Sequence, residues 1–240
     1  MHILVATPAY GCMVHIDYMH SVNNLCVMAE KAGVKVTIMT IGNNSLITEA
    51  RNCLISYFVA NKDLTHMLFL DADIAIPDFC VPRLVSRNVD IIGVPIPMKA
   101  FGPDYSPIIT IGDIYSIDET GLAEVEHINT ACMLVSKKAA MDACMASEKY
   151  SKSVNRGVQL DMVQYDVFKC GSFNGRYVPE DFYFCYKMRD LGYRIYADLT
   201  IPIKHCGMYE FHTNEEFLSG IINAFKYKDS IDIHSKDRLN

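Results

Sequence analysis

The first hundred residues alternate between two hydrophobic periodicities. Short continuous apolar runs are typical of strands covered on both faces, whereas apolar residues three and four apart indicate helices. The pattern predicts strands at 3–6, 34–41, 66–70 and 90–94, and helices at 17–31, 46–60 and 77–87. This alternation implies right-handed crossovers and a mostly parallel sheet flanked by helices, an α/β fold.

The second half of the chain is less regular. Turn signals between 108 and 125 predict antiparallel hairpins at a sheet edge, and the polar stretch 147–177 is predicted to be a long loop region. Further strands are expected at 128–135, 193–196 and 201–203, and helices at 138–146 and 181–191. No repeat, low-complexity stretch or clear linker divides the chain, so we expect a single domain over residues 1–240.

An apolar stripe at helical spacing lies between residues 216 and 227, close to two lysines. We expect it to pack on its own domain; a membrane-surface helix or a weak homodimer contact is the alternative. No apolar run approaches the roughly 20 residues that span a bilayer. The N-terminus lacks the basic region and cleavage site of a secretory signal, so the expected location is the cytoplasm, or the host cytoplasm for a viral protein.

Composition and charge narrow the class of partner. Half of the 240 residues are apolar and 21% are charged, which is ordinary for a globular protein. The formal net charge of −6 argues against nucleic acid as a partner, because such binding depends on clustered Lys and Arg. The nine cysteines are an odd number without a C-x-x-C, so we expect reduced, mostly buried thiols in a reducing compartment.

Two aspartates, Asp71 and Asp73, directly follow the apolar strand predicted at 66–70. Ligands of open α/β sheets collect beyond the carboxyl ends of the strands. Residues two apart point the same way in an extended chain, so both carboxylates are predicted to converge on one Mn²⁺ or Mg²⁺ while Ala72 faces the protein. Such a cation would in turn bind a diphosphate. The alternative is a turn in which an aspartate only caps backbone N–H groups.

A second group of candidate residues lies in the C-terminal third of the chain. Glu180 and Asp181 begin a predicted helix, where the helix dipole favours a carboxylate, and His205 follows an apolar run. A carboxylate in that place is suited to act as a base, and an imidazole nitrogen can be a third metal ligand. Helix capping by the carboxylates and a core role for the histidine are the alternatives.

The ordered segments SLITEARN, THMLFLDADI, DIIGVPIPMK, EDFYFCYKMRDLGYRIYAD and HCG resemble nucleotide-sugar-dependent glycosyltransferases of the GT-A fold, in particular members encoded by large algal viruses and phages. The resemblance covers about residues 1–210. It implies a Rossmann-like sheet with antiparallel hairpins on the acceptor side, a nucleotide-sugar-binding half at about 1–105 and an acceptor-side half at about 106–240. The implied activity moves a hexose or deoxyhexose from a nucleoside-diphosphate sugar, with UDP favoured, to a hydroxyl of a glycan or glycoconjugate.

The resemblance also implies roles for individual residues. Asp73 would bind the metal that bridges the donor phosphates, Asp71 would contact the ribose or the metal shell, and His205 would complete the ligands. Asp181 would be the base of an inverting reaction, with Glu180 as the second candidate. The donor-binding positions outside the metal ligands are Thr7, Pro8, Tyr10, Arg51, Ala72 and Lys99.

Two other functions remain open from the sequence. A sugar-phosphate nucleotidyltransferase also uses an acidic pair on a similar sheet, but we would expect a glycine-rich loop after the first strand, where TPAYGCM has only Gly11. A carbohydrate- or nucleotide-binding protein without turnover is the non-enzymatic alternative. The absence of G-x-G-x-x-G and G-x-x-x-x-G-K-[ST] disfavours dehydrogenases and P-loop enzymes.

Overall fold

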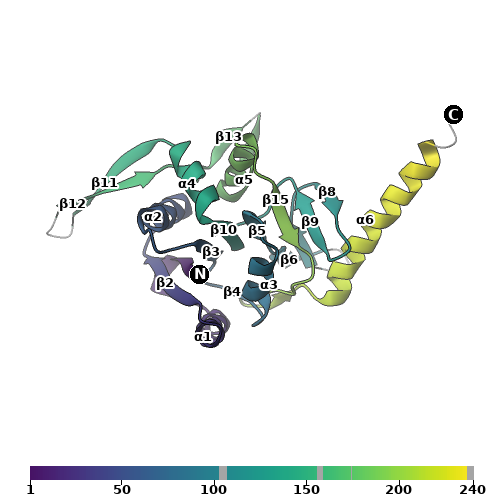
Figure 1. Ribbon diagram of the computed structural model, residues 1–240, viewed down its shortest axis with the longest axis horizontal. Helices are drawn as coiled ribbons and strands as arrows, with labels where there is room; N and C mark the ends of the chain where they lie inside the picture. The colour runs from purple at the N-terminus through teal and green to yellow at the C-terminus, as the bar shows by residue number, and fades with distance from the viewer. Residues whose placement is uncertain (103–106, 156–158, 174, 237–240) are drawn as a thin grey trace.

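The computed structural model describes residues 1–102, 107–155, 159–173 and 175–236. Its centre is an eight-stranded sheet with helices on both faces (Figure 1). In spatial order the strands are β2 (Lys35–Gly42), β1 (His2–Ala9), β3 (His66–Leu70), β10 (Cys132–Ser136), β5 (Ile91–Gly93), β15 (Ile195–Asp198), β9 (Leu122–Val125) and β8 (Ile114–Ile117).

The sheet combines a parallel core with reversed strands. β2, β1 and β3 run parallel, as do β5 and β15, whereas β10 lies antiparallel between β3 and β5. The described chain between β5 and β10 contains no helix, so nothing there forms the crossover that a parallel pair requires. The predicted α/β class is confirmed, and the sheet is mixed where the pattern had predicted a mostly parallel one.

Helices cover the sheet in two groups, and each encloses its own core. α2, α4 and α5 pack on the face that carries Leu4 and Ala6, whereas α1 and α3 pack on the face that carries Ile3 and Val5. This alternation along β1 follows from the two-residue period of a strand. The helices are α1 (Ile16–Lys31), α2 (Ile47–Ala60), α3 (Cys80–Ser86), α4 (Lys137–Met145), α5 (Glu180–Asp190) and α6 (Glu215–Lys236), with a 3₁₀ turn at Tyr10–Cys12.

The expected edge hairpins are present, and two other expectations were wrong. β8 and β9 pair at the sheet edge, and β7 (Pro107–Thr110) pairs with β6 (Ile96–Phe101). The stretch predicted as a loop contains two hairpins, formed by β11 (Lys149–Asn155) with β12 (Gln159–Tyr165) and β13 (Gly171–Phe173) with β14 (Arg176–Val178). No strand forms at 201–203. The chain there leads into β16 (Lys204–His205), which lies between β17 (Phe211–His212) and β4 (Ile74–Ala75).

The C-terminal apolar stripe lies on α6. Leu218 is buried, and Ile221 and Ile222 pack against the core, so the first turns of this helix cover their own domain as expected. The later turns extend away from the body of the protein (Figure 1). Within the described residues, no helix is both long and apolar enough to cross a membrane.

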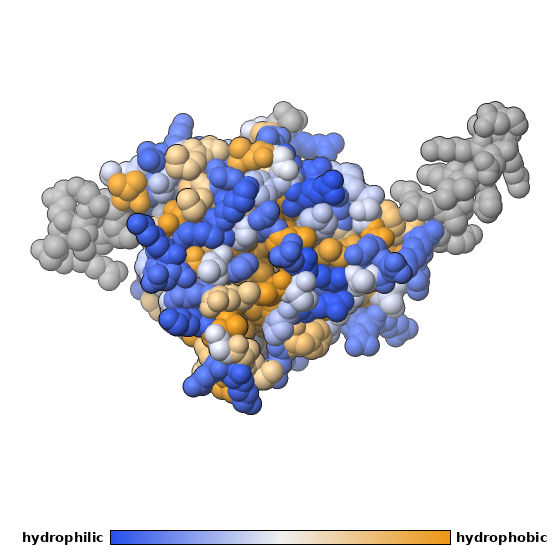
Figure 2. Space-filling model, viewed as in Figure 1, coloured by the Kyte–Doolittle hydropathy of each residue, from blue (hydrophilic) through white to orange (hydrophobic). Residues whose placement is uncertain are grey.

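An apolar groove of about 170 Å³ lies at the amino ends of β1 and β2, between α1 and α3. It is lined by Met1, Ile3, Leu25, Met28, Ala29, Ala32, Val34, Val81, Pro82 and Val85. Figure 2 shows apolar side chains exposed on this face of the molecule. The acidic turn follows β3, at the opposite, carboxyl edge of the same parallel strands β2, β1 and β3.

Candidate functional site

The predicted acidic turn lies directly beyond the carboxyl end of β3. The backbone N–H of Asp71 donates to Ala131 O at 2.9 Å, and Ile74 N–H donates to Asp71 O at 3.0 Å, so the chain turns immediately after the strand. The turn is also held from two other elements, because His15 N–H donates to Ala72 O and Cys206 N–H donates to Asp73 O, both at 2.8 Å. Segments far apart in the sequence therefore fix its backbone.

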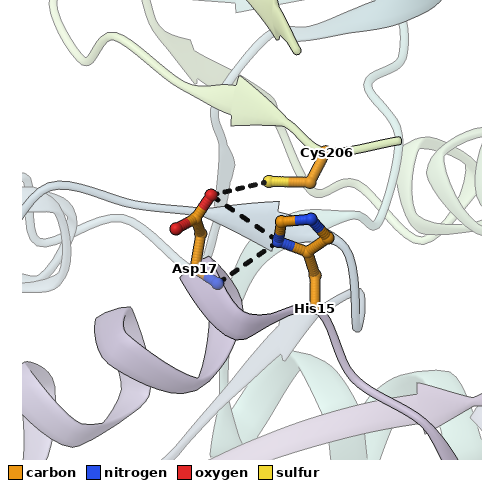
Figure 3. A group of neighbouring side chains, drawn as sticks. All are labelled: His15, Asp17 and Cys206. Atoms are coloured by element: carbon orange, nitrogen blue, oxygen red, sulfur yellow. Dashed lines mark hydrogen bonds and ion pairs between the residues drawn. The ribbon is translucent and has the colours of Figure 1, made fainter. Parts of the chain in front are cut away.

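Side chains next to these backbone contacts form a compact group of His15, Asp17 and Cys206 (Figure 3). Asp17 Oδ2 lies 3.6 Å from His15 Nδ1 and 3.7 Å from Cys206 Sγ. These are residue types that ligate metals, but Lys204 Nζ lies 2.7 Å from the same carboxylate oxygen and supplies its countercharge. The contacts of Asp17 with Lys204 and Cys206 therefore connect the start of α1 to β16 and the residue after it, next to the acidic turn.

The side chains of Asp71 and Asp73 point to different partners, not to one shared point. Arg51 Nη2 donates to both oxygens of Asp71 at 3.0 and 3.2 Å. Asp73 Oδ2 instead lies 2.5 Å from Lys99 Nζ and 3.4 Å from His205 Nε2. The expected geometry assumed extended backbone, whereas these residues form a turn after the strand.

Asp73 is held strongly in its ionised form. Burial opposes ionisation of this carboxyl, but hydrogen bonds and charge from His205 and Lys99 outweigh burial and lower its pKa to about 2. The imidazole is itself oriented, since its Nδ1 lies 2.7 Å from Pro97 O and donates to that carbonyl. Nε2 is then left facing the carboxylate, an orientation that histidine metal ligands commonly adopt.

Arg51 connects the acidic turn to the start of α5. Its side chain is 2% exposed, and its Nε lies 3.3 Å from Glu180 Oε1 while Nη2 binds Asp71. The sequence resemblance had implied a contact between this arginine and the base or diphosphate. The structure places its guanidinium between two carboxylates, with the Phe69 ring 5.6 Å from the guanidinium carbon, and Arg51 lines one of the cavities described below.

Asp181 is the titratable group with the opposite perturbation. Burial, followed by the charge of Glu180, raises its pKa to about 6, against partial compensation from the Phe182 backbone N–H. That N–H donates to Asp181 Oδ1 at 2.9 Å. A carboxyl group close to half ionisation near pH 6 is suited to exchange protons under physiological conditions.

Two adjoining cavities lie at this edge of the sheet, and both are lined by Asp71 and Ile47. The larger, about 500 Å³, is also lined by Pro8, Tyr10, Met13, Val14, His15, Asn44, Ser45, Ala72 and Asp73. The smaller, about 210 Å³, is also lined by Arg51, Ile96, Pro97, Met98, Thr110, Asn129, Ala131, Glu180, Asp181 and His205. The predicted residues from the two halves of the chain therefore come together around one region.

Two predicted residues do not line these cavities. Thr7 is fully buried, and its hydroxyl lies 2.6 Å from Tyr18 Oη. Lys99 contributes through its ion pair with Asp73, and neither cavity includes it as a lining residue.

Several polar residues at the same edge were not predicted from the sequence. Asn44 and Ser45 follow β2 and line the larger cavity, while Asn129 precedes β10 and lines the smaller one. For Asn44 and Ser45 the position after a predicted strand was an available signal, whereas Asn129 fell inside the strand predicted at 128–135. Asn129 had no charged neighbour to draw attention to it.

Comparison with known proteins locates the fold but no family. No protein-family model matches the chain, and no curated protein matches it. Among solved structures, A197 from STIV superposes with a TM-score of 0.53 at 15% identity, over 89% of this chain and 95% of that chain. The two proteins therefore share a fold over nearly their whole lengths.

Two further structures align at lower similarity. One is a glycosyltransferase involved in the glycosylation of the major capsid of PBCV-1, with a TM-score of 0.32 at 12% identity over 59% of this chain and 63% of that chain. The other is HddC from Yersinia pseudotuberculosis, with a TM-score of 0.31 at 12% identity over 59% of this chain and 79% of that chain.

Proposed function

We propose that this protein is a metal-dependent glycosyltransferase of the GT-A type that uses a nucleoside-diphosphate sugar. The observation that carries the proposal is that Asp73 and His205 face each other at 3.4 Å beside two adjoining cavities, and that Asp181 lines the same cavity as His205. The pKa of Asp73 is lowered to about 2 and that of Asp181 is raised to about 6, in agreement with different roles for the two carboxyl groups. Such divergence is typical of sites in which one carboxylate stays charged and another moves a proton.

The donor would bind with its nucleotide in the larger cavity. Pro8 and Tyr10 line that cavity, which agrees with the roles implied by the sequence resemblance, and the ring of Tyr10 is largely exposed and available for stacking. The cavity ends at Asp73, beside Lys99 and His205. We expect the diphosphate there and the sugar in the smaller cavity, with UDP as the favoured nucleotide.

The residues around Asp73 fit a divalent cation. A carboxylate oxygen and an imidazole nitrogen face each other at 3.4 Å, and because Nδ1 donates to Pro97 O, Nε2 is the nitrogen that can bind a cation beside the carboxylate. Asp73 and His205 would hold Mn²⁺ or Mg²⁺. When bound, the cation would act as a Lewis acid that stabilises the departing diphosphate. Asp71 would act from one shell further out, because Arg51 occupies both of its oxygens.

The chain itself supplies the proton acceptor and the countercharges. Asp181 would take the proton of the acceptor hydroxyl as that oxygen attacks the anomeric carbon, a contribution of roughly 10²–10⁴-fold. Attack opposite the leaving group inverts the configuration. Lys99 would move from Asp73 towards the diphosphate when the cation binds, since an ammonium group and a metal ion repel each other at one carboxylate. We expect the protein to act in a reducing compartment such as the cytoplasm, where its nine cysteines would stay as thiols.

The proposal is tested by a calorimetric binding screen of UDP-, GDP- and dTDP-sugars with and without Mn²⁺, followed by an assay for nucleoside diphosphate release. We expect metal-dependent binding and slow hydrolysis of at least one donor. Asp73→Ala should abolish the metal-dependent part of binding, whereas Asp78→Ala is the matched control, because Asp78 is an exposed aspartate bonded to Asn24. If no donor binds or releases diphosphate, the proposal is wrong. Pyrophosphate release from a nucleoside triphosphate and a sugar 1-phosphate would favour the nucleotidyltransferase.

A further inference from the structure

Three metal-ligating side chains from two distant parts of the chain converge next to the acidic turn. His15 caps α1, Asp17 lies in the first turn of that helix, and Cys206 follows β16. One potential ligand atom from each residue lies within 4.8 Å of the other two, and Figure 3 shows the side chains close together. An imidazole, a carboxylate and a thiolate are all ligands that Zn²⁺ accepts.

The spacing of these atoms fits a tetrahedral zinc ion. Zinc bonds of about 2.1 Å to nitrogen or oxygen and about 2.3 Å to sulfur place an N–O pair of ligands about 3.4 Å apart and an O–S pair about 3.6 Å apart. Asp17 Oδ2 lies 3.6 Å from His15 Nδ1 and 3.7 Å from Cys206 Sγ. Two of the three ligand separations are therefore already close to those around a bound zinc ion. The side chains of His15 and Asp17 are partly exposed, so water can reach the fourth position.

Two existing contacts compete with the ion. His15 Nδ1 accepts the Asp17 N–H at 3.2 Å, and Lys204 Nζ lies 2.7 Å from Asp17 Oδ2. Lys204 Nζ also lies 2.6 Å from Glu210 Oε1, so this ammonium keeps a partner when Asp17 binds a metal ion. Its ion pair with Asp17 is partly exposed, and exposed ion pairs contribute little to stability. The lysine is therefore a weak competitor for a coordinated cation.

The sulfur ligand distinguishes this group from the proposed Mn²⁺ position. Asp73 and His205 offer one oxygen and one nitrogen, which suits Mn²⁺ or Mg²⁺ together with phosphate oxygens. A cysteine thiolate is a soft ligand and selects Zn²⁺ over both of those ions. The two groups of side chains are therefore expected to bind different metals.

The same residues hold the acidic turn through their backbones. The N–H of His15 donates to Ala72 O, and the N–H of Cys206 donates to Asp73 O, both at 2.8 Å. An ion that joins the side chains of His15 and Cys206 therefore restricts both of these backbone donors at once.

We infer that His15 Nδ1, Asp17 Oδ2 and Cys206 Sγ bind one Zn²⁺ ion, with water in the fourth position, and that this ion holds the backbone of the acidic turn in place. The thiol of Cys206 passes its proton to solvent as the zinc–sulfur bond forms, and no oxidation state changes. The inference does not depend on the proposed function, because the ion would hold the turn whatever the protein binds there.

Titration of the reduced, chelator-treated protein with Co²⁺, a spectroscopic substitute for Zn²⁺, tests the ligands directly. We expect a thiolate-to-cobalt charge-transfer band that added Zn²⁺ removes. Cys206→Ser should abolish this band, whereas Asp73→Ala should keep it. Cys12→Ser, at an exposed cysteine, is the matched control and should also keep it. A wild type without the band, a band that survives in Cys206→Ser, or its loss in either of the other variants would overturn the inference.

Calorimetry with Zn²⁺ tests the competition at Asp17. Lys204→Gln should tighten Zn²⁺ binding about tenfold, because an ammonium no longer competes for the carboxylate oxygen. Asp17→Asn should weaken Zn²⁺ binding at least about tenfold while the charge-transfer band of Co²⁺ remains. Lys138→Gln removes the lysine of another exposed ion pair and should leave the affinity unchanged. Unchanged or weaker binding in Lys204→Gln, or unchanged binding in Asp17→Asn, would overturn the inference.

Hydrogen exchange followed by NMR measures the effect on the acidic turn. With Zn²⁺ bound, the amide protons of His15 and Cys206 should exchange at least about tenfold more slowly, and amides of the remote strands β8 and β9 should not change. Cys206→Ser should remove the slowing. Equal exchange rates at His15 and Cys206 with and without Zn²⁺ would overturn the role of the ion in holding the turn. No nucleotide is present in these experiments, so failure of the proposed donor to bind leaves their outcome unaffected.

Discussion

Asp181 is expected to set the acid limb of the activity profile. Its pKa of about 6, raised by burial and by Glu180, means that about nine-tenths of the protein carries the ionised base at pH 7 and about one-tenth at pH 5. The rate of transfer at low donor concentration should therefore fall about tenfold between these values. The Asp73 carboxyl stays ionised over the same range, so its own titration does not contribute to this fall.

Two substitutions test the cause of the shift. Glu180→Gln removes the neighbouring negative charge while keeping an oxygen for Arg51, so the midpoint of the profile should move below pH 6. Asp181→Asn should bind donor normally and lose transfer. An unchanged midpoint in the first variant would contradict the role of Glu180, and full transfer in the second would remove Asp181 as the base.

The same shift predicts an effect on stability. A carboxyl whose pKa is raised from 3.8 to about 6 on folding favours the protonated folded state, so stability falls as pH rises through this window. At about 1.4 kcal/mol per pKa unit, Asp181→Asn should stabilise the protein by about 3 kcal/mol at pH 7, and the gain should shrink towards pH 4. Urea unfolding at both pH values measures the difference, with Asp78→Asn as the exposed control. A variant no more stable than wild type at pH 7 would refute the burial argument.

Three further changes should lower stability for separate reasons, each read from urea unfolding. Arg51→Met leaves two partly buried carboxylates without their cation and should cost about 3 kcal/mol; an unchanged midpoint would mean that the ion pairs contribute nothing. Asn52→Ala removes the acceptor of the Phe168 N–H at 2.8 Å and should cost about 2 kcal/mol. Burial raises the pKa of Asp198, but hydrogen bonds from Arg87 and its own loop outweigh burial and lower it, so this carboxylate stabilises the fold above its ordinary pKa and the stabilisation is lost on acidification. Asp198→Asn should therefore be less stable at pH 7 and less sensitive to acid than wild type.

The strands of the core could be predicted because burial on both faces leaves a continuous apolar run. β1 and β3 lie where the pattern placed them, and their buried side chains divide between two cores. The hairpin of β11 and β12 was not predictable in the same way. The sequence of β11, KYSKSVN, is mostly polar, so no apolar alternation distinguished it from a loop.

The sequence also predicted which strand ends come together around the two cavities, but not how the side chains divide among partners. Asp71 and Asp73 follow β3 as expected, and His205 approaches from β16, yet only Asp73 faces the histidine. The partner of Asp71 is decided by where α2 lies on the sheet, a tertiary feature that spacing along the chain does not contain. Asn129 was missed for the same reason, because the pattern placed it inside a strand at 128–135 and only the fold shows that it lines the smaller cavity.

Helix α2 fixes the separation between the two ends of the proposed site, Asp73 and Asp181. Neighbouring helix residues point about 100° apart, so Arg51 and Asn52 reach different parts of the chain. Arg51 joins the acidic turn to the start of α5. Asn52 Oδ1 accepts hydrogen bonds from the backbone N–H groups of 167–168, and the Phe168 ring stacks on Phe184 of α5. The separation between Asp73 and Asp181, the proposed diphosphate and proton-acceptor positions, therefore depends on contacts made by α2. Because both contacts are buried and charged or fully hydrogen-bonded, that helix cannot rotate without breaking them, and the separation is set before any donor binds.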